Sequence, residues 1–355
     1  MAAEDLTVKT LTTWVLQQER AGKIDNELGV VISSIALACK QIATLVNRSG
    51  ISNLTGLAGA ENVQGEDQKK LDVISNDVFK ACLAGTGRTT VMASEEEDLP
   101  VPVDVTETDS GNYVVVFDPL DGSSNIDAGI SVGSIWGIFA ESDGCQIDME
   151  SDDVESQINK CVQSSTQAGT GLLSSGYCLY SSASILVLTV GDGVYGFTLD
   201  PLVGEFILTH PRMRVPKAGK IYSFNEGNAD LWSPGTQAYM QSLKKPDLWG
   251  GKPYSARYIG SLVGDFHRTL LYGGIYGYPG DAKNPAGKLR LLYECAPMSF
   301  IMEQAGGKGS TGQERVMEIA PTGVHQRVPL FVGSPDEVDY LCSFVKDEPS
   351  PVARK

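Results

Sequence analysis

Hydrophobic periodicity divides the chain into helical and strand-like segments. Residues 7–49 carry apolar side chains three and four positions apart, which predicts amphipathic helix with Asp25 or Asn26 as a cap. Residues 70–83 repeat this pattern and predict a further helix. Strand-like apolar runs, the last two joined as a hairpin, stand at residues 89–93, 113–117, 134–139, 185–189 and 194–199.

The remaining segments indicate how the chain is organised. Residues 141–170 are polar and rich in Gly and Ser, which predicts a long surface loop. The Pro- and Arg-rich stretch 210–220 is the best candidate for a domain boundary. We therefore expect an N-terminal domain of residues 1–212 and a C-terminal domain of residues 213–355. Strand and helix signals alternate in both domains, so we expect the fold class α/β, with the helices and sheets layered as in α+β proteins.

Composition narrows the function classes. A chain of 355 residues with 42% hydrophobic and 20% charged positions is typical of a soluble globular enzyme. No apolar run approaches the roughly 20 residues that span a bilayer, and a net charge of −16 disfavours nucleic acids and anionic membranes. The three histidines have no ligand spacing, so zinc chemistry is not expected. Free, mostly buried thiols are expected at Cys39, Cys82, Cys178, Cys295 and Cys342.

The most informative segment is residues 114–125, where a strand ends in Asp118 and Asp121. Paired carboxylates at a strand end favour hard divalent cations. Gly122, Ser123 and Ser124 follow directly, and small residues at a turn expose backbone N–H groups that bind anions. A cation site beside an anion site predicts phosphoryl-transfer chemistry.

Acidic residues follow a second strand, at 94–98. Such a run is commonly a solvated loop, but its place after the strand 89–93 favours a functional role for Glu95 and Glu96. Glu294 stands in an apolar stretch, where a lone acid is costly unless it is paired or binds metal. A structural salt bridge with Arg290 is the alternative. Lys288 and Arg290 suit a second phosphate, although such a run is also typical of a solvated strand edge.

A further acidic group precedes the helix at residue 70. Hydrolysis needs a water molecule that is positioned and deprotonated, and a carboxylate beside the metal site can do this. Asp72, or the loop acids Glu66 and Asp67, could take this role. Capping of the helix N-terminus is the alternative for the loop acids.

Taken together, these motifs closely resemble the fructose-1,6-bisphosphatase family. The likeness runs from about residue 10 to 345, and its motifs lie at residues 65–72, 94–96, 117–125, 222–227, 256–261 and 287–295. It implies a sugar-phosphatase fold of five layers, α-β-α-β-α, and a homotetramer. It also implies hydrolysis of the 1-phosphate of fructose 1,6-bisphosphate to give fructose 6-phosphate and phosphate.

The resemblance also implies roles for individual residues. Two or more Mg²⁺ ions per subunit would be held by Glu95, Glu96, Asp118, Asp121, Glu294 and the Leu120 carbonyl. The catalytic acids would be Asp72, with Glu66 or Asp67, and Glu96; the spacing leaves the choice between the two loop acids open. Substrate would be bound by Asp121, Gly122, Ser123, Ser124, Asn225, Arg257, Tyr258, Tyr278, Lys288 and Arg290, with Arg257 reaching in from a neighbouring subunit.

Regulation is the last feature that the resemblance touches. Asn112 and Ala140 replace the basic residues of AMP-inhibited relatives, so we expect weak AMP inhibition. The loop after residue 141 is similar to the regulatory insertion of the chloroplast form, with Cys145 and Cys161 as its disulfide; two unpaired thiols are the alternative. This likeness implies reduction by an f-type thioredoxin, Calvin-cycle metabolism and starch synthesis, and a chloroplast-stroma location, with the transit peptide absent from this chain.

Two rival functions remain. A sedoheptulose-1,7-bisphosphatase would share the metal site, although the segments around Asn225 and Arg257 favour fructose bisphosphate. A catalytically silent subunit that binds sugar phosphates is the other rival. The complete set of five carboxylates at Glu95, Glu96, Asp118, Asp121 and Glu294 argues against a silent subunit, since binding alone does not require all of them.

Overall fold

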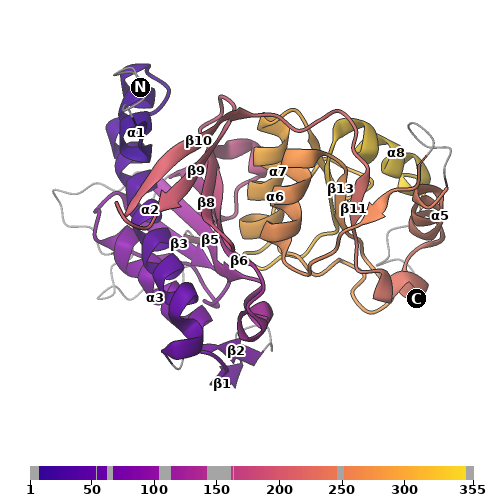
Figure 1. The fold of residues 1–355 in the computed structure, drawn as a ribbon, viewed down its shortest axis with the longest axis horizontal. Coiled ribbons are helices and arrows are strands. Elements are labelled where there is room, and N and C mark those ends of the chain that lie inside the picture. Colours follow the sequence, from indigo (N-terminus) through magenta and orange to yellow (C-terminus); the bar gives the residue numbers. More distant parts are fainter. Residues whose placement is uncertain are drawn as a thin grey trace.

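The computed structural model arranges the chain in five layers, α-β-α-β-α, as expected (Figure 1). Helices cover both outer faces, two sheets lie inside them, and a helical layer separates the sheets. The described residues are 8–52, 54–61, 67–103, 113–141, 161–162, 164–245 and 252–348.

The larger sheet is built mainly from the first half of the chain. Its middle strands are buried on both faces; in β5, Val114 and Val116 face the central helices whereas Val115 and Phe117 face the first helical layer. In spatial order its eight described strands are β10 (Glu205–Met213), β9 (Val194–Asp200), β8 (Ser184–Thr189), β7 (Leu172–Tyr180), β6 (Val132–Ala140), β5 (Tyr113–Asp121), β3 (Thr89–Ser94) and β4 (Val101–Pro102). The predicted hairpin is confirmed as β8 and β9.

The first helical layer covers the outer face of this sheet. It consists of α1 (Leu11–Arg20), α2 (Asn26–Arg48) and α3 (Lys70–Ala84). The predicted cap at Asp25 is confirmed: Gly22, with a positive φ, separates α1 from α2, and Asp25 starts α2 by accepting a hydrogen bond from the Leu28 N–H at 2.7 Å. The small hairpin of β1 (Leu57–Glu61) and β2 (Asp67–Lys69) precedes α3.

The helical segment Asn26–Ile51 requires a correction. Within the described residues, this helix is long and apolar enough to cross a membrane, judged by length and composition alone. No apolar segment of that length was expected from the sequence. Its most apolar window is 56% buried, because α2 packs against α3 and strands β7 and β8. This packing is that of a core helix.

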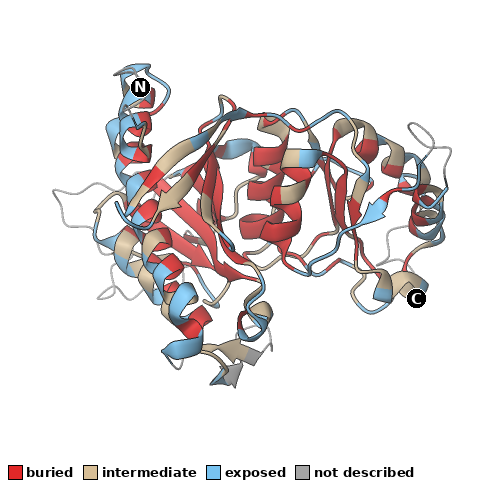
Figure 2. Ribbon diagram, in the orientation of Figure 1, coloured by how far each residue is buried: buried red, intermediate tan, exposed pale blue. Residues whose placement is uncertain are grey.

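The second half of the chain supplies the other three layers. Helices α6 (Leu262–Tyr272) and α7 (Ala296–Gln304) lie between the sheets and are largely buried (Figure 2). The five described strands of the smaller sheet are, in order, β12 (Ser255–Ala256), β11 (Ile221–Ser223), β13 (Ile275–Tyr278), β15 (Leu330–Gly333) and β14 (Lys308–Ser310). Helices α5 (Pro234–Leu243) and α8 (Pro335–Val345) cover its outer face.

The two halves share one hydrophobic core. A single cluster joins Val116 and Tyr177 of the larger sheet to Phe266 and Ile301 of the central helices and Val332 of the smaller sheet. Strand β10 reaches Met213 and so overlaps the stretch 210–220 that was expected to be a boundary. The domain division at residue 212 stays a prediction.

Candidate active site

The acidic segments after β3 and β5 meet because these strands are parallel neighbours. Ser94 pairs with Phe117, so Glu95 emerges beside Asp118, and the Glu95 N–H donates to the Phe117 carbonyl at 3.2 Å. Strand β5 continues to Asp121 rather than ending at residue 117. A shift of register between Asp118 and Asp121 lets both carboxylates reach one pocket.

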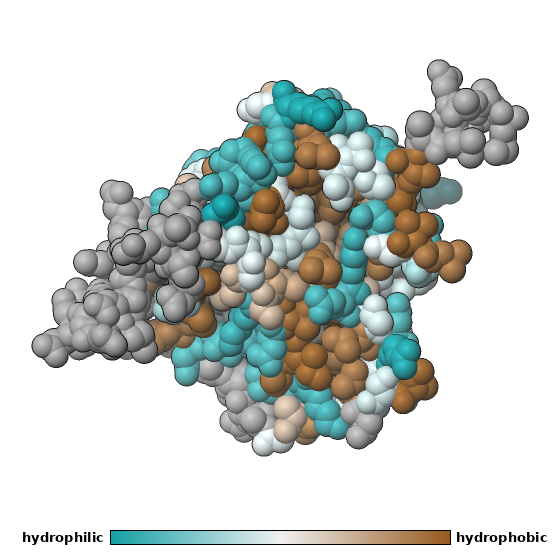
Figure 3. Space-filling model, turned by 90° about the vertical axis from the view of Figure 1, so that its left-hand side faces the viewer, coloured by the Kyte–Doolittle hydropathy of each residue, from teal (hydrophilic) through white to brown (hydrophobic). Residues whose placement is uncertain are grey.

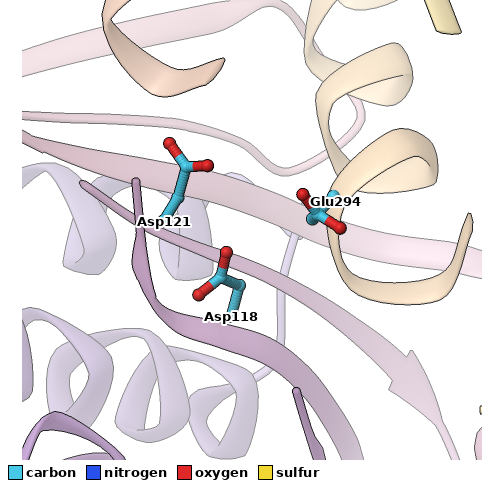
Figure 4. Close-up of side chains that lie close together, drawn as sticks. All are labelled: Asp118, Asp121 and Glu294. Atoms are coloured by element: carbon cyan, nitrogen blue, oxygen red, sulfur yellow. The ribbon is translucent and has the colours of Figure 1, made fainter. Parts of the chain in front are cut away.

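Glu294 reaches the same pocket from the central helical layer. It lies on the π-helical turn Leu291–Cys295 that starts α7. Carboxylate oxygens of Asp118, Asp121 and Glu294 lie within 4.8 Å of one another, and the three side chains point toward a common point (Figure 4). Their residues are only 2%, 8% and 2% exposed. Three acids from two distant segments therefore converge in a buried position.

Arg290 connects the two halves of this acidic group. Its guanidinium lies 2.9 Å from Glu95 and 3.9 Å from Glu294, and its backbone N–H donates to Glu294 at 2.6 Å. The salt bridge with Glu294, left open by the sequence, is present. Arg290 also lines the pocket, so its pairing does not exclude contact with a ligand.

Burial raises the pKa values of these carboxyl groups. Desolvation raises the pKa of Asp121 to about 7 and that of Glu294 to about 8, despite hydrogen bonds to backbone N–H groups. The pKa of Asp118 lies well above its usual range because of desolvation and the negative charges of Glu95 and Asp121. The pKa of Glu96 rises to about 7, mainly by desolvation. The pocket therefore favours added positive charge.

The residues fit a hard divalent cation. Six acidic and three basic side chains line the pocket, so the acids outnumber the bases two to one. The clustered donors are all carboxylate oxygens, without histidine or cysteine, which is the donor set that Mg²⁺ prefers. A cation would supply the charge that the buried carboxylates lack.

The small residues after Asp121 form a tight turn at the pocket. Gly122 takes φ 74°, a left-handed conformation, and the 3₁₀ turn Ser123–Ala128 begins directly after it. Gly122, Ser123 and Ser124 all line the pocket beside the carboxylates. Backbone N–H groups at such a turn favour a phosphate.

Asp72 lies in the first turn of α3 and faces the same pocket. Its carboxylate accepts the Lys69 N–H at 2.7 Å and a hydrogen bond from Ser123. Burial raises the pKa of Asp72 to about 6. The loop acids are not placed: Glu66 lies outside the described residues, and only the backbone of Asp67 is described, in β2.

The sugar-binding candidates extend the pocket, which encloses about 520 Å³, away from the carboxylates. Asn225, Tyr258, Tyr278 and Lys288 all line it, as does Leu120 on the metal side. Arg257 is exposed and is not among the lining residues of its own chain. Its predicted place in a neighbouring subunit's site stays a prediction.

Sequence reasoning missed several residues of the site. Lys69 lines the pocket, Gln68 donates to Glu96 at 2.5 Å, and Asp265 is fully buried below the loop that carries Tyr258. Lys69 and Gln68 stand inside the motif 65–72, where only the acids drew attention. Asp265 had a readable signal, since it is a lone acid in an apolar helix, as Glu294 is.

The regulatory candidates are only partly placed. Cys161 is disulfide-bonded and 1% exposed, whereas Cys145 lies outside the described residues. Asn112 also lies outside them, and Ala140 is exposed at the end of β6. The expected free thiols are confirmed at Cys39, Cys82, Cys178, Cys295 and Cys342. Cys82 and Cys342 are half-buried, and the other three are buried.

Comparison with known proteins gives consistent results. The N-terminal domain model of fructose-1-6-bisphosphatase matches residues 9–211, and the C-terminal domain model matches residues 215–346. The chain is 64% identical over 338 residues to a chloroplastic fructose-1,6-bisphosphatase of Spinacia oleracea, covering 94% of this chain and 80% of the relative. It is also 64% identical over 341 residues to the chloroplastic fructose-1,6-bisphosphatase of Triticum aestivum, and the match covers 96% of this chain and 82% of that relative.

Solved structures agree with this fold. Leishmania major fructose-1,6-bisphosphatase in its holo form superposes with a TM-score of 0.87 at 45% identity, covering 95% of this chain and 99% of that chain. The T-state structure of the same Leishmania major enzyme superposes with a TM-score of 0.81 at 43% identity, again covering 95% of this chain and 99% of that chain. The chain thus belongs to the fructose-1,6-bisphosphatase family and is a phosphoric monoester hydrolase.

Proposed function

We propose that the chain hydrolyses the 1-phosphate of D-fructose 1,6-bisphosphate to fructose 6-phosphate and phosphate, with Mg²⁺ as cofactor. The observation that carries this proposal is the convergence of Asp118, Asp121 and Glu294 beside the anion-binding turn at Gly122. Lys288 lies at the same pocket and suits a second phosphate, as a bisphosphate requires.

Each part of the pocket has its own task. Glu95, Glu96, Asp118, Asp121 and Glu294, with the Leu120 carbonyl, would hold Mg²⁺, which when bound neutralises phosphate charge and stabilises the departing sugar oxygen. Ser123 and Ser124 bind the scissile phosphate through backbone N–H groups. The sugar and its 6-phosphate contact Asn225, Tyr258, Tyr278 and Lys288.

Asp72 is the proposed proton acceptor for the attacking water. Its pKa of about 6 leaves the carboxylate mostly ionised at neutral pH and basic enough to accept a proton. The Lys69 N–H at 2.7 Å and Ser123 orient the carboxylate toward the phosphate-binding turn. Glu96 lies close enough to Asp72 for the charges of the two carboxylates to interact, and we assign no separate proton-transfer step to it.

Phosphate release tests this proposal directly. The reduced protein at pH 8 is expected to release phosphate from fructose 1,6-bisphosphate in proportion to bound Mg²⁺ and to stop when EDTA is added. Phosphorus NMR of the product should show fructose 6-phosphate rather than the 1-phosphate. Sedoheptulose 1,7-bisphosphate is the competing substrate. No turnover of the fructose ester under these conditions, or faster turnover of the sedoheptulose ester, would overturn the proposal.

Regulation and location follow the chloroplastic relatives. A Cys145–Cys161 disulfide is supported by the bonded state of Cys161 and by the free thiols at the other described cysteines. We infer that an f-type thioredoxin reduces it and thereby activates the enzyme. The names of the relatives support the chloroplast, and we extend this to the stroma, the Calvin cycle and starch synthesis.

A homotetramer is proposed from the family and from the outer helical face. Figure 3 views this face and shows apolar surface among polar side chains. Val30 and Leu37 of α2 are 39% and 52% exposed, and with Ile74 and Val78 of α3 they line a groove. Such a face suits a second subunit. Light scattering should give four times the chain mass; a monomer would contradict it.

A further inference from the structure

The loop that carries Tyr258 is held from beneath by a buried acid. Asp265 lies in the first turn of α6, is 0% exposed, and is not among the residues that line the pocket. Its carboxylate accepts the Ile259 N–H at 2.9 Å and 3.1 Å and the Gly260 N–H at 3.1 Å. These bonds fix the backbone immediately after Tyr258, because a carboxylate binds N–H donors strongly.

Arg268 extends this support to the neighbouring strand. It forms an ion pair with Asp265 and donates to the Arg257 carbonyl, and it donates to the Ser223 hydroxyl at 2.8 Å. Ser223 ends β11, two residues before Asn225. The Asp265–Arg268 pair therefore contacts both segments that bring Tyr258 and Asn225 to the sugar end of the pocket.

The same segment continues into the phosphate end of the site. The Gly260 carbonyl accepts a hydrogen bond from the Asn125 side chain at 3.0 Å, and the Val263 N–H donates to Asp121 at 3.0 Å. Those two contacts use the backbone of Gly260 and Val263 and not the Asp265 carboxylate. Loss of the carboxylate therefore acts on the sugar end through lost hydrogen bonds, whereas it reaches Asp121 only through its charge.

We propose that Asp265, with Arg268, is a positioning residue that sets the affinity of the pocket for the sugar-phosphate part of the substrate. This inference rests on the proposed function, since it concerns how the same pocket recognises a fructose phosphate. Asp265 touches neither substrate nor the reacting phosphate. Its effect passes through the backbone of residues 257–260.

The test is Asp265→Asn, which preserves size but replaces the anionic acceptor with an amide. The Michaelis constant for fructose 1,6-bisphosphate and the inhibition constant of fructose 6-phosphate should rise together, by about 10-fold or more, because hydrogen bonds to a charged group are lost. The inhibition constant of inorganic phosphate, the half-saturating Mg²⁺ concentration and kcat should each stay within about twofold of wild type.

Glu337→Gln is the matched control. Glu337 is also a fully buried acid; it accepts the Gly219 N–H at 3.3 Å and is bonded to the Tyr254 hydroxyl, but it lies on α8 in the outer layer. This variant should lower the melting temperature without changing either sugar-phosphate constant. If Asp265→Asn does not fold, Arg268→Lys supplies the same test, since only 19% of its side chain is exposed and it loses the planar fork.

The outcomes separate the two proposals. Equal weakening of inorganic phosphate and fructose 6-phosphate, or a lower melting temperature with unchanged sugar-phosphate constants, would overturn the positioning role of Asp265. Wild-type protein that releases no phosphate from fructose 1,6-bisphosphate would instead overturn the proposed function. The two failures cannot be confused, because wild type is assayed beside each variant.

Discussion

Arg290 places its guanidinium 2.9 Å from Glu95, with only 5% and 12% of the two side chains exposed. This ion pair joins the segment after β3 to the segment before α7. Arg290 is thus a buried cation beside several carboxylates that otherwise repel one another, and its removal leaves uncompensated negative charge.

Arg290→Met is therefore expected to destabilise the Mg²⁺-free protein by roughly 3 to 5 kcal/mol at pH 8. Saturating Mg²⁺ should shrink the loss, because bound cations replace the missing charge. Urea unfolding in EDTA and in Mg²⁺ measures both values. Arg315→Met is the control: its exposed pairs with Glu303 and Glu318 should contribute at most about 1 kcal/mol. Equal losses in the two variants would contradict the role given to Arg290.

Stability should depend on pH in the direction set by the raised pKa values. Asp72, Glu96, Asp121 and Glu294 titrate in the folded protein at about 6, 7, 7 and 8, above their ordinary values near 4. Between about pH 4 and 8 the folded state then binds more protons than the unfolded state, so unfolding free energy falls as pH rises.

Melting temperatures in EDTA should therefore drop from pH 5.5 to pH 8.5. The gain in melting temperature on adding Mg²⁺ should grow over the same range, because the metal binds the deprotonated carboxylates. Differential scanning calorimetry at four pH values, each with EDTA or Mg²⁺, measures both trends. A constant Mg²⁺ effect across this range would argue against metal binding at these acids.

Asp118→Asn separates catalysis from stability. We expect kcat/KM to fall by more than roughly 100-fold, since even loss of a group that orients a metal ligand costs 10- to 100-fold. The Mg²⁺-free variant should be more stable than wild type at pH 8 by about 1 kcal/mol or more, because the cost of burying an acid whose pKa is raised by desolvation and by neighbouring carboxylates is removed. Phosphate release and urea unfolding give the two numbers. Reduced stability would show that Asp118 is held by interactions other than those described.

Gly122→Ala tests the anion-binding turn against a matched glycine. Gly122 has φ 74° and Gly191, in the turn between β8 and β9, has φ 83°. Alanine at either position should cost about 1 kcal/mol of stability, because an L-residue is strained there. Only Gly122→Ala should weaken inhibition by inorganic phosphate and slow phosphate release, since only that turn lines the pocket. Comparable activity in both variants would remove the turn from the site.

Cys145→Ser tests the regulatory disulfide. The variant should be active without reductant, whereas oxidised wild type should need dithiothreitol or thioredoxin. In the chain-entropy view the bridge restrains its loop by roughly 3 kcal/mol. Activity assays with and without reductant decide the point, and Cys342→Ser, at a half-buried free thiol, is the control. A variant that still requires dithiothreitol would show that the pairing is wrong.

The sequence predicted the parts of the fold that have strong local patterns. The hairpin β8–β9 and the helix α3 follow from periodicity and turn residues alone. Strand β10 was missed, because its apolar run is only three residues long, 206–208, and is followed by Pro211 and exposed polar side chains, which are typical of an edge strand. The start of α2 follows from the predicted cap at Asp25, whereas the end of α1 before Gly22 was not assigned to a residue.

The site shows the same division. Asp118, Asp121, Glu95 and Glu294 could be selected because acids at strand ends and in apolar surroundings are unusual. That they meet in space follows from the parallel pairing of β3 with β5 and from the packing of α7, which local sequence does not encode. Asp265 acts through backbone N–H groups, and no side-chain motif reports such a contact.

The π-helical turn that carries Glu294 limits how regular the start of α7 can be. A π-helical turn holds one residue more than an α-helical turn, so Leu291–Cys295 is equivalent to a helix start with a single insertion. Deleting that extra position would give α7 a regular beginning but rotate the residues before it by about 100°. Glu294 would then swing away from its acidic neighbours. The less regular turn keeps Glu294 directed into the acidic pocket, so a more regular start of α7 would cost the site one of its carboxylates.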